Sequence, residues 1–509
     1  MGQVNYRHLQ NGSDIRGISL EGVQGQTPNL TASEAGPIGY GFITWLASKA
    51  GKKPADLRVT IGRDPRISGP GLCAAFIKGA AAAGAAVTDC GLATTPAMFM
   101  TTVFDAYASD GAVMISASHL PWNRNGFKFF DRDGGLQKED ITAILQTAEA
   151  LDPLSAASTA GATSPQDEPP AKDTRLMTIY AAHLRRIITD KLGCQPESRV
   201  LAGLKIAVDA GNGSGGFFPS AVLAPLGADV SASKYLTPDG RFPNHIPNPE
   251  NDEAIADLAQ QVCAAHCDFG IIFDTDVDRC AAVDRQGHPI NHDSIVALAA
   301  CLIAGEHPGT TVVTDSITSD HLTDFLQEHL GLHHFRYRRG YKNVINKAQA
   351  LNAEGIDCEL AIETSGHAAI RENYFLDDGA YLATRIIVEA ARLAGAGKTL
   401  DSLLDPLVLP KESREVRMDI HDERPRAFGD ALLRDFAVWA EKQGLQIAKP
   451  NYEGVRLQFP SGWCLLRNSL HDPLMSLNMQ SDKEGGTDAM AAMLKDFLGR
   501  YDALDTTAL

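Results

Sequence analysis

The sequence predicts an α/β protein of several domains, in which short apolar strands alternate with amphipathic helices. Its 509 residues correspond to about three or four domains at the usual length of roughly 100–200 residues each. Strand-like apolar runs ending in Gly- or Asp-rich turns recur along most of the chain, with helix-like runs between them. Such alternation is typical of sheets covered by helices. The longest apolar run, Ile295–Ala304, has ten residues, about half the length of a membrane-spanning helix.

The predicted elements follow one another in a repeating order. The first group comprises strands at Leu57–Ile61, Ala86–Cys90 and Ala112–Ser116 and an Ala-rich helix at Gly71–Ala83. The pattern begins again with strands at Leu204–Val208, Asp229–Leu236, Phe269–Phe273, Thr311–Thr314 and Glu359–Ile362. Because binding residues gather at the carboxyl ends of parallel strands, the residues that follow these strands are the first candidates for a functional site.

The composition argues against several classes of protein. Lys and Arg number 46 against 63 Asp and Glu, a formal net charge of −17. The chain therefore lacks the basic excess that broad binding to nucleic acid or to an anionic membrane requires. Nine scattered cysteines without a Cys-x-x-Cys pair argue against a disulfide scaffold or zinc finger. Met1–Gly12 has no hydrophobic segment of a secretory signal, so we expect a cytoplasmic protein without nucleic-acid or membrane partners.

Composition also indicates where domains meet. Leu151–Lys172 is rich in Ala, Ser, Thr and Pro and has no periodic apolar face, so it is predicted to be a flexible insertion or linker. A second change of composition comes at Pro406–Pro410, before a charged stretch. No linker composition marks the boundary between the two middle domains. The predicted domains are residues 1–172, 173–290, 291–408 and 409–509.

The strongest single motif is Asp274-Thr275-Asp276-Val277-Asp278-Arg279, directly after the predicted strand Phe269–Phe273. Three carboxylates at alternate positions after a strand can converge on one hard cation, and oxygen ligands suit Mg²⁺. A solvated acidic turn is the alternative. Arg279 and Arg285 stand where the loop of an EF-hand needs Gly and Glu, which argues against an EF-hand.

A second motif places a hydroxyl beside an imidazole. Ser116-Ala117-Ser118-His119 follows a predicted strand, and Asn125-Gly126-Phe127-Lys128 comes shortly afterwards. Ser118 is a candidate nucleophile, although no Gly-x-Ser-x-Gly elbow surrounds it. Taken alone, a Ser-His pair in a loop is more often part of a turn.

Of two further motifs, one suits the binding of sugar hydroxyls and the other the binding of a phosphate. Glu363-Thr364-Ser365-Gly366-His367 combines a carboxylate, a hydroxyl and an imidazole that can bind sugar hydroxyls, although a helix cap explains it almost as well. Arg467-Asn468-Ser469-Leu470-His471-Asp472-Pro473 offers a guanidinium and a hydroxyl that can grip a phosphate. The alternative for this segment is an ordinary junction between strand and loop.

The glycines of Gly211-Asn212-Gly213-Ser214-Gly215-Gly216 match the dinucleotide fingerprint formally. A Rossmann unit needs an acidic residue at the end of the next strand. The strand predicted over Asp229–Leu236 ends in Lys234-Tyr235-Leu236 instead. A Gly-rich turn is therefore favoured over a dinucleotide site, and an NAD-dependent dehydrogenase is a distant alternative.

In their order along the chain, these motifs resemble the α-D-phosphohexomutase family of phosphoglucomutases, phosphomannomutases and phosphoglucosamine mutases. The resemblance covers nearly the whole chain. It rests on Asp14–Gly17, Gly62–Gly69, Ser116–His119, Asp209–Gly213, Phe242–His245, Pro247–Pro249, Asp274–Arg279 and Glu363–His367. Ser116 replaces a family Thr, and Thr275 and Val277 replace two glycines.

The resemblance implies both a fold and a reaction. The implied fold has three similar α/β domains with mixed sheets and a C-terminal α+β domain around a central cleft. The implied enzyme carries a phosphoserine at Ser118 and interconverts hexose 1-phosphate and hexose 6-phosphate, of glucose or mannose, through a hexose 1,6-bisphosphate. Mg²⁺ is the implied metal, sugar phosphates are the expected small-molecule partners, and a monomer or small homo-oligomer is expected.

The resemblance also assigns roles to residues. The implied catalytic residues are Arg16, Ser118, His119 and Lys128, and the implied metal ligands are Ser118, Asp274, Asp276 and Asp278. The implied substrate-binding residues are Arg279, Arg339, Tyr341, Glu363, Ser365, His367, Arg467 and Ser469.

Three departures from the family pattern concern substrate contacts. Leu470-His471 interrupts the phosphate loop, Tyr341 replaces a family His, and Ile317 replaces a Lys. A weaker grip on the distal phosphate would favour a hexose-1,6-bisphosphate synthase, which releases the intermediate. A catalytically silent sugar-phosphate-binding regulator is the alternative from another class, and the retained Ser118 and three aspartates argue against it.

Overall fold

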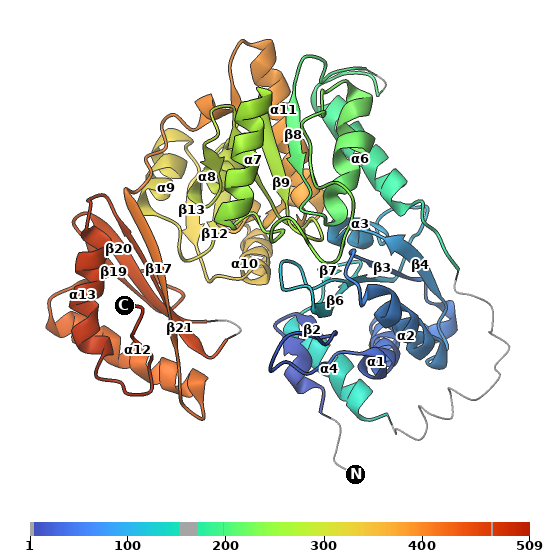
Figure 1. Ribbon diagram of the computed structural model, residues 1–509, viewed down its shortest axis with the longest axis horizontal. Helices are drawn as coiled ribbons and strands as arrows, with labels where there is room; N and C mark the ends of the chain where they lie inside the picture. Colours follow the sequence, from blue (N-terminus) through green and yellow to red (C-terminus); the bar gives the residue numbers. More distant parts are fainter. Residues whose placement is uncertain (1–4, 152–170, 197, 470–471) are drawn as a thin grey trace. The chain divides into compact units, whose positions relative to one another are not determined.

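The computed structural model (Figure 1) describes residues 5–151, 171–196, 198–469 and 472–509. The chain divides into two units, which we call unit 1 (residues 1–291 and 365–402) and unit 2 (residues 292–364 and 403–509). Residues 152–170 of the predicted linker, and Leu470-His471 of the predicted phosphate loop, lie outside the described residues.

The first sheet of unit 1 is mixed, with the strand order β1-β2-β6-β5-β3-β4 and β7 paired to β6. Its strands are β1 (Gln10–Asn11), β2 (Asp14–Ile18), β3 (Val59–Arg63), β4 (Val87–Leu92), β5 (Gly111–Ile115), β6 (Arg124–Asp131) and β7 (Gly134–Gly135). Strand β3 runs parallel to β4 and β5, whereas β6 is antiparallel to β5 and β2. The helices α1 (Ala32–Ala50), α2 (Gly69–Ala82) and α4 (Lys138–Glu149) share one apolar cluster with this sheet. The short helix α3 (Thr95–Met100) packs against β3, β5 and β6.

Strand β6 separates the core from the functional side of this sheet. Phe127 and Phe129 belong to the apolar cluster beneath α1 and α2. Because successive side chains of a strand point to opposite faces, Lys128 between them projects from the other face, where it contacts Asp276. The alternation of apolar and charged residues therefore delivers a buried ammonium group to the site.

The second sheet of unit 1 has the order β11-β10-β9-β8, with β8 parallel to β9 and the remaining pairs antiparallel. Its strands are β8 (Ile206–Asp209), β9 (Phe269–Phe273), β10 (Cys280–Asp284) and β11 (Pro289–Ile290). Helix α7 (Asp252–Ala265) packs on β8, β9 and β10, beside which it lies in Figure 1. Helix α11 (Gly379–Gly395) packs on β9, β10 and α6 (Leu176–Lys191). Asp209 is the last residue of β8 and Asp274 follows β9. Since the two strands are parallel, both aspartates lie at the same edge of the sheet.

A short antiparallel pair completes the strands of unit 1. It consists of β15 (Ala368–Ile370) and β16 (Leu376–Asp377), and Asp377 at its end is buried.

Unit 2 holds a parallel group of strands and an antiparallel sheet. Strand β12 (Thr311–Thr314) is parallel to β13 (His333–Arg336) and β14 (Cys358–Ile362), and the accompanying helices are α8 (Asp293–Ala304), α9 (Asp320–Asp324) and α10 (Tyr341–Ala353). The C-terminal sheet is antiparallel and has the order β17-β21-β20-β19-β18. Its strands are β17 (Glu412–Asp419), β18 (Gln446–Ile447), β19 (Val455–Phe459), β20 (Gly462–Asn468) and β21 (Leu474–Ser481). Both α12 (Pro425–Lys442) and α13 (Gly486–Leu498) contribute to the one apolar cluster of this sheet.

The predicted fold class is confirmed, because mixed α/β sheets precede a C-terminal α+β domain. Strands β9 and β12 have the predicted bounds, and the other confirmed strands and α2 begin and end within two residues of prediction. The strand predicted over Asp229–Leu236 is wrong. That segment makes only isolated bridges at Asp229 and Lys234, because the Asp229 carboxylate accepts from Ser231 N and turns the chain.

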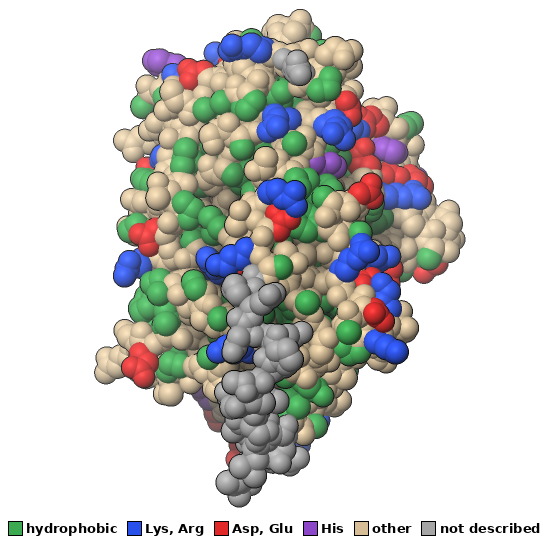
Figure 2. Space-filling view, turned by 90° about the vertical axis from the view of Figure 1, so that its right-hand side faces the viewer, with side chains coloured by type: hydrophobic (Ala, Val, Ile, Leu, Met, Phe, Trp, Pro, Cys, Tyr) green, Lys and Arg blue, Asp and Glu red, His purple; other side chains and the backbone are tan. Residues whose placement is uncertain are grey.

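The molecular surface bears both signs of charge. On the described part of the face in Figure 2, Lys and Arg side chains lie beside Asp and Glu among apolar residues, and neither sign forms a continuous patch. Within the described ranges, no helix is long and apolar enough to cross a bilayer. The nine cysteines are free thiols, as their scattered spacing predicts.

Candidate active site

Ser118 lies in a buried turn after strand β5 and adopts a left-handed backbone conformation, with φ of 50°. A positive φ is uncommon for a residue other than Gly, and sparsely populated backbone conformations of this kind cluster at functional sites. The backbone N–H of Ser118 donates to Ser116 Oγ at 2.9 Å. Its own hydroxyl donates to Asp274 Oδ2 at 2.8 Å and accepts from Arg279 Nη2 at 3.0 Å. The turn therefore presents one hydroxyl between a carboxylate and a guanidinium.

One buried guanidinium holds this turn in place. Arg66, in the loop after β3, is paired with Asp64 at 3.1 Å, and both side chains are fully buried. Its donors reach the backbone carbonyls of Ser118, Leu120 (2.6 Å), Pro121 (2.8 Å) and Arg124 (2.9 Å). Burial raises the pKa of Asp64 to about 6, against the charge of Arg66. The sequence motif contains this pair, but its function as a clamp on the serine turn emerges only from the structure.

The three aspartates after β9 converge as predicted. One oxygen from each of Asp274, Asp276 and Asp278 lies within 4.8 Å of the others, and all three residues are buried. Val277 between them has φ of 67°, a conformation that suits the Gly of the family pattern. Asp276 Oδ1 and Asp278 Oδ1 are buried without a hydrogen-bond partner.

Lys128 balances part of this negative charge. Its Nζ donates to Asp276 Oδ2 at 2.8 Å and to Asp278 Oδ2. Although burial disfavours a charged amine, the charges of Asp276 and Asp278 raise the pKa of Lys128 well above its ordinary value. Thr95 Oγ1 donates to the same Asp276 oxygen at 2.5 Å, a contact that no motif in the sequence indicates.

The surroundings shift the pKa values of Asp274 and Asp278 in opposite directions. Burial and the charges of Asp278 and Asp276 raise the pKa of Asp274 well above its ordinary value. Burial also acts on Asp278, but the charges of Lys128, His367 and Arg279 outweigh it and lower its pKa. An all-oxygen set with two orphaned buried carboxylate oxygens is the donor set that a hard divalent cation requires, so the residues fit a metal of that class.

Arg279 joins the metal loop to the serine turn. Besides Ser118 Oγ, its Nη2 donates to His119 Nδ1 at 2.6 Å, and its Nη1 donates to Asn248 Oδ1 at 3.1 Å. His119 Nδ1 also lies 3.4 Å from Ser118 Oγ. Burial and the charges of Arg279 and Arg16 lower the pKa of His119 well below its usual range. Its neutral ring is the acceptor from Arg279.

Three further predicted residues belong to unit 1. Arg16 donates to the carbonyl of Ala117 at 2.7 Å, beside the serine. His367 Nδ1 lies 2.5 Å from Asp377 Oδ2 and 4.0 Å from Asp278 Oδ1. Burial and the charge of Asp278 raise the pKa of Asp377 well above its ordinary value. Ser365 is buried. Asp377, which the sequence analysis missed, thus orients His367.

The remaining predicted residues lie in unit 2. The carboxylate of Glu363 accepts from the backbone N–H of Gly340 at 2.6 Å, between Arg339 and the first residue of α10, Tyr341. Glu363 is thereby placed at the loop that carries two other predicted substrate-binding residues.

The side chain of Arg467 lies near the loop that carries Arg339 and Tyr341. Its Nη2 lies 3.7 Å from Glu415 Oε1. Burial and the nearby charge of Arg339 lower the pKa of Arg467. Glu453, which the sequence analysis missed, accepts from the backbone N–H of Arg339 at 3.1 Å. Ser469 Oγ accepts from Asp472 N at 3.2 Å.

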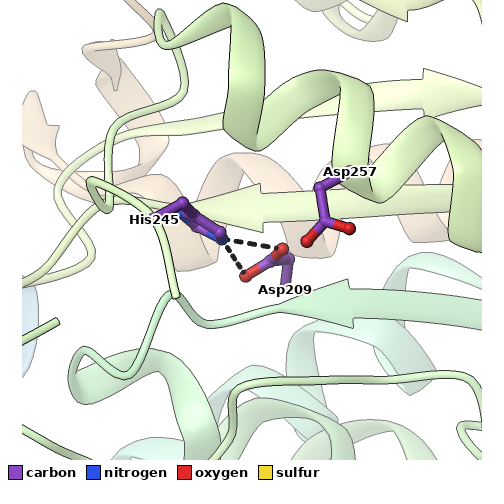
Figure 3. Close-up of side chains that lie close together, drawn as sticks. All are labelled: Asp209, His245 and Asp257. Atoms are coloured by element: carbon purple, nitrogen blue, oxygen red, sulfur yellow. Dashed lines mark hydrogen bonds and ion pairs between the residues drawn. The ribbon is translucent and has the colours of Figure 1, made fainter. Parts of the chain in front are cut away.

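A second acidic group lies apart from these contacts. Figure 3 shows His245 pointing at Asp209, the last residue of β8, with Asp257 of α7 close by. Lys234 Nζ lies 2.7 Å from Asp257 Oδ2 and 4.0 Å from Asp209 Oδ2. An ammonium group of the chain already supplies positive charge to this group.

The glycines that imitate a dinucleotide fingerprint have packing functions. A Cβ at Gly213 would lie 2.7 Å from the carbonyl oxygen of Thr275 in the metal loop, and one at Gly216 would lie 1.9 Å from that of Leu236. Because these positions have no side chains, the turn after β8 packs closely against the backbone of its neighbours, including the metal loop. This agrees with the interpretation of the segment as a Gly-rich turn.

Comparison with known proteins gives consistent results along the chain. Three successive segments match the families described as phosphoglucomutase/phosphomannomutase α/β/α domains I, II and III, at residues 7–154, 180–287 and 291–408. A phosphomannomutase/phosphoglucomutase of Pseudomonas putida is 30% identical over 485 residues, 95% of this chain and 94% of the relative. A phosphoglucomutase of Neisseria gonorrhoeae is 28% identical over 485 residues, 94% of this chain and 95% of the relative.

Solved structures extend the similarity to the fold. The crystal structure of a phosphoglucomutase/phosphomannomutase family protein from Burkholderia thailandensis superposes with a TM-score of 0.76 at 24% identity. The superposition covers 98% of this chain and 99% of the other.

Proposed function

This chain belongs to the phosphoglucomutase/phosphomannomutase family and is a phosphohexomutase, and from this premise we propose the reaction and the roles of its residues. It interconverts hexose 1-phosphate and hexose 6-phosphate, of glucose, mannose or both, through a phosphoserine at Ser118 and a hexose 1,6-bisphosphate. The observation that carries the proposal is the position of Ser118 Oγ, which is hydrogen-bonded to both Asp274 and Arg279 in a buried turn.

In the forward step, a hydroxyl oxygen of the sugar phosphate bonds to the phosphorus as the bond from phosphorus to Ser118 Oγ breaks. The sugar hydroxyl loses its proton, and a hexose 1,6-bisphosphate forms. The reverse step from the other end of the turned bisphosphate restores the phosphoserine. Such transfers depend mainly on positioning and charge neutralisation, and Arg16, Lys128 and Arg279 supply fixed positive charge around Ser118.

Asp274, Asp276 and Asp278, with an oxygen on Ser118, would hold Mg²⁺. The bound ion would stabilise the negative charge that develops on the transferred group and on the serine oxygen. His119 Nδ1 lies 3.4 Å from Ser118 Oγ, and we assign the neutral His119 as the group that takes the proton of the sugar hydroxyl and passes it to the departing oxygen of Ser118. Lys128 stays protonated and contributes positive charge.

The residues that bind the rest of the substrate are proposed from chemistry. Glu363, Ser365 and His367 bind sugar hydroxyls. Arg339, Tyr341, Arg467 and Ser469 bind the phosphate that does not react. These residues bind the sugar hydroxyls and the non-reacting phosphate, and none of them distinguishes C1 of the sugar from C6. The bisphosphate can therefore bind with either phosphate facing Ser118.

One observation favours a second candidate, the release of the bisphosphate by a hexose-1,6-bisphosphate synthase. Glu415 lies 3.7 Å from Arg467, and Glu453 bonds to the backbone of Arg339. These carboxylates reduce the positive charge available to a distal phosphate, in addition to the departures at Ile317, Tyr341 and Leu470-His471.

We also propose the four-domain division at residues 172, 290 and 408, a cytoplasmic location, and a monomer or small homo-oligomer. Sugar-phosphate substrates fit the family. The bisphosphate is proposed as both activator and intermediate.

Intact mass of the protein tests the phosphoserine. After incubation with glucose 1,6-bisphosphate and Mg²⁺, the wild type gains one phosphoryl group, and Ser118→Ala does not. Ser48→Ala is the matched control, since it removes an exposed hydroxyl near the end of α1 and should retain the gain. Loss of the gain in the Ser48 variant, or its persistence in the Ser118 variant, would contradict the assignment.

Phosphorus NMR separates the two candidate functions. Glucose 1-phosphate and mannose 1-phosphate are each supplied with Mg²⁺ and a trace of bisphosphate. Conversion to the 6-phosphate supports the mutase. Net accumulation of bisphosphate when a phosphoryl donor is added supports the synthase.

A further inference from the structure

The pair formed by Asp209 and His245 lies outside the contacts of Ser118 but leads toward them. His245 Nε2 lies 3.1 Å and 3.0 Å from the two carboxylate oxygens of Asp209. Its Nδ1 lies 3.0 Å from the carbonyl of Ile246. Both side chains are buried, at 4% and 0% exposed. An imidazole with both nitrogens engaged is fixed in position and fixes the loop that carries it.

Backbone packing reinforces the attachment of this loop. Gly211, two residues after Asp209, has φ of 51°, and a Cβ there would lie 2.7 Å from Pro247 Cβ. Asn244 Nδ2 donates to Asn212 Oδ1 at 2.7 Å. The loop 244–250 therefore lies directly on the turn that follows β8.

The far end of the same loop holds Arg279. Asn248 Oδ1 accepts from Arg279 Nη1 at 3.1 Å and from the backbone N–H of Glu250 at 3.1 Å. Glu250 Oε2 lies 3.6 Å from Arg279 Nη1. The other terminal nitrogen of this guanidinium, Nη2, donates to Ser118 Oγ and His119 Nδ1.

Asp209, His245 and Asp257 lie close enough together to hold a metal ion, which is the alternative to a positioning role. The amine of Lys234 already lies between Asp209 and Asp257, and His245 uses both oxygens of Asp209. The carboxylates are thus satisfied by groups of the chain itself. The contacts favour a positioning role over a metal site.

We infer that His245 and Asp209 are positioning residues for phosphoryl transfer. Their hydrogen bonds brace loop 244–250, so that Asn248 holds one end of the Arg279 guanidinium while the other end is presented to Ser118 and His119. The inference rests on the proposed function for the identity of the group that Arg279 serves. Neither His245 nor Asp209 touches the reacting atoms.

The turnover of hexose 1-phosphate tests this chain of contacts. His245→Ala should lower kcat by about 10-fold to 100-fold, the range known for removal of a group that orients a metal ligand, while KM changes little. His245→Gln can still donate to Asp209 and should recover most of the lost kcat. The Tm of each variant is measured alongside.

His288→Ala is the matched control. His288 Nδ1 lies 2.9 Å from Asp284 Oδ2 at the turn between β10 and β11 of the same sheet, but its side chain is 76% exposed. His288→Ala removes a His–Asp pair that, within the described residues, has no hydrogen bond to Arg279 or to loop 244–250. The kcat of this variant should therefore equal that of the wild type.

A double-mutant cycle shows whether the effect passes through Asn248. Asn248→Ala should lower kcat as His245→Ala does. Adding His245→Ala to that variant should then cost less than about 2-fold, because residues acting in series are not additive. If His245→Ala does not fold, His245→Gln and Asn248→Ala decide the question, since an unchanged kcat in Asn248→Ala overturns the inference.

Other outcomes also overturn it. Equal losses of kcat in His245→Ala and His288→Ala, or an undiminished effect of His245→Ala in the Asn248→Ala background, would show that the pair only stabilises the fold. The proposed function is judged separately, on phosphorylation of Ser118 in the wild type. A wild type that turns over without phosphorylation of Ser118 refutes that proposal, while the kcat comparisons still decide the positioning role.

Discussion

The loop that carries Ser118 is held by one guanidinium group, that of Arg66. Four backbone carbonyls of the loop accept from it, and its ion-pair partner Asp64 is as deeply buried as Arg66 itself. A planar group with five donors is required to reach several carbonyls at once, and Lys cannot replace it. The geometry of Ser118, the proposed nucleophile, thus depends on a side chain to which we assign no step of the reaction.

Arg66→Ala is expected to destabilise the protein by about 3–5 kcal/mol, because it leaves a buried carboxylate without its partner. It should also lower kcat, as the serine turn loses its clamp. Burial holds the pKa of Asp64 at about 6 in the wild type, and removal of the guanidinium raises it further. The folded variant therefore keeps the proton of Asp64 above pH 6, whereas the unfolded chain has released it. As a result, the stability of the variant continues to fall above pH 6, where the contribution of Asp64 in the wild type has levelled off. Urea unfolding should show a larger loss at pH 8 than at pH 6.

The chain contains a matched control for this substitution. Arg175 bonds to Asp173 with the same spacing, but its side chain is 72% exposed. Arg175→Ala should leave the unfolding free energy unchanged within error at both pH values, because solvent screens an exposed pair. Equal losses in the two variants would show that the burial of Arg66 is not what makes it important.

At the level of single residues, the sequence predicts the groups that stand together in one motif and misses their distant partners. Ser118 and the three aspartates each follow a strand and stand beside other polar residues of a short motif. Thr95, Asp377 and Glu453 contact predicted residues from elsewhere in the chain. A single sequence contains no signal for such pairs, because nothing local distinguishes these residues from surface ones.

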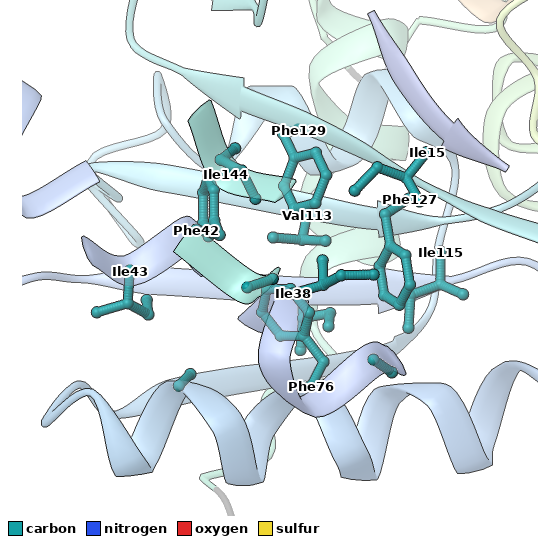
Figure 4. Close-up of a cluster of buried hydrophobic side chains, with 14 of the residues drawn as sticks. Ile15, Ile38, Phe42, Ile43, Phe76, Val113, Ile115, Phe127, Phe129 and Ile144 are labelled. Carbon is teal, nitrogen blue, oxygen red and sulfur yellow. The ribbon is translucent and has the colours of Figure 1, made fainter. Parts of the chain in front are cut away.

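Among the elements, the crossing of α1 and α2 depends on glycine. Figure 4 shows Ile38 and Phe42 of α1 and Phe76 of α2 in the apolar cluster beneath the first sheet. A Cβ at Gly79 would lie 1.8 Å from the carbonyl oxygen of Gly36, and one at Gly39 would lie 2.3 Å from that of Phe76. The two helices therefore meet backbone to backbone.

Gly79→Ala is expected to destabilise the protein by about 1–3 kcal/mol, the usual cost of overpacking, although Ala favours a helix. Gly71→Ala in the same helix should have the opposite sign. No heavy atom lies within 4 Å of a Cβ at Gly71, so the helix propensity of Ala should stabilise it by up to about 1 kcal/mol. Urea unfolding of both variants measures the difference. The same sign for both changes would disprove the close crossing.

The helix α2 shows what could be predicted at this scale. Its Ala-rich composition predicts a helix with nearly correct bounds, but the two glycines look alike in the sequence. Which of them meets a neighbour depends on the crossing angle of α1 and α2. The error over residues 229–236 has a local cause, because the Asp229 carboxylate accepts from Ser231 N and turns the chain where a strand is predicted.

Across the whole molecule, a net charge of −17 surrounds a site for an anionic substrate. Within unit 1, Arg16, Lys128 and Arg279 supply positive charge, but three aspartates largely balance it. The chain alone therefore leaves little surplus positive charge beside Ser118. A bound divalent cation would make the net charge beside Ser118 positive. Binding of an anionic substrate by this acidic protein therefore requires the metal.

Magnesium is therefore expected to stabilise the folded protein. A ligand that binds only the folded state contributes about 2.7 kcal/mol at 100 times its Kd, so Tm should rise when Mg²⁺ replaces EDTA and should fall again on removal of the ion. Asp276→Asn should abolish most of the increase, because it removes one of the converging carboxylates.

Asp257→Asn distinguishes the two acidic groups of unit 1. It removes a carboxylate from the group with Asp209 and His245, where Lys234 already lies, and should leave the magnesium-dependent increase in Tm unchanged. If Asp257→Asn abolished the increase while Asp276→Asn preserved it, the ion would bind beside β8 instead of beside Ser118. The charge reversal required for an anionic substrate would then need another source, and the roles proposed for the three aspartates would fail together.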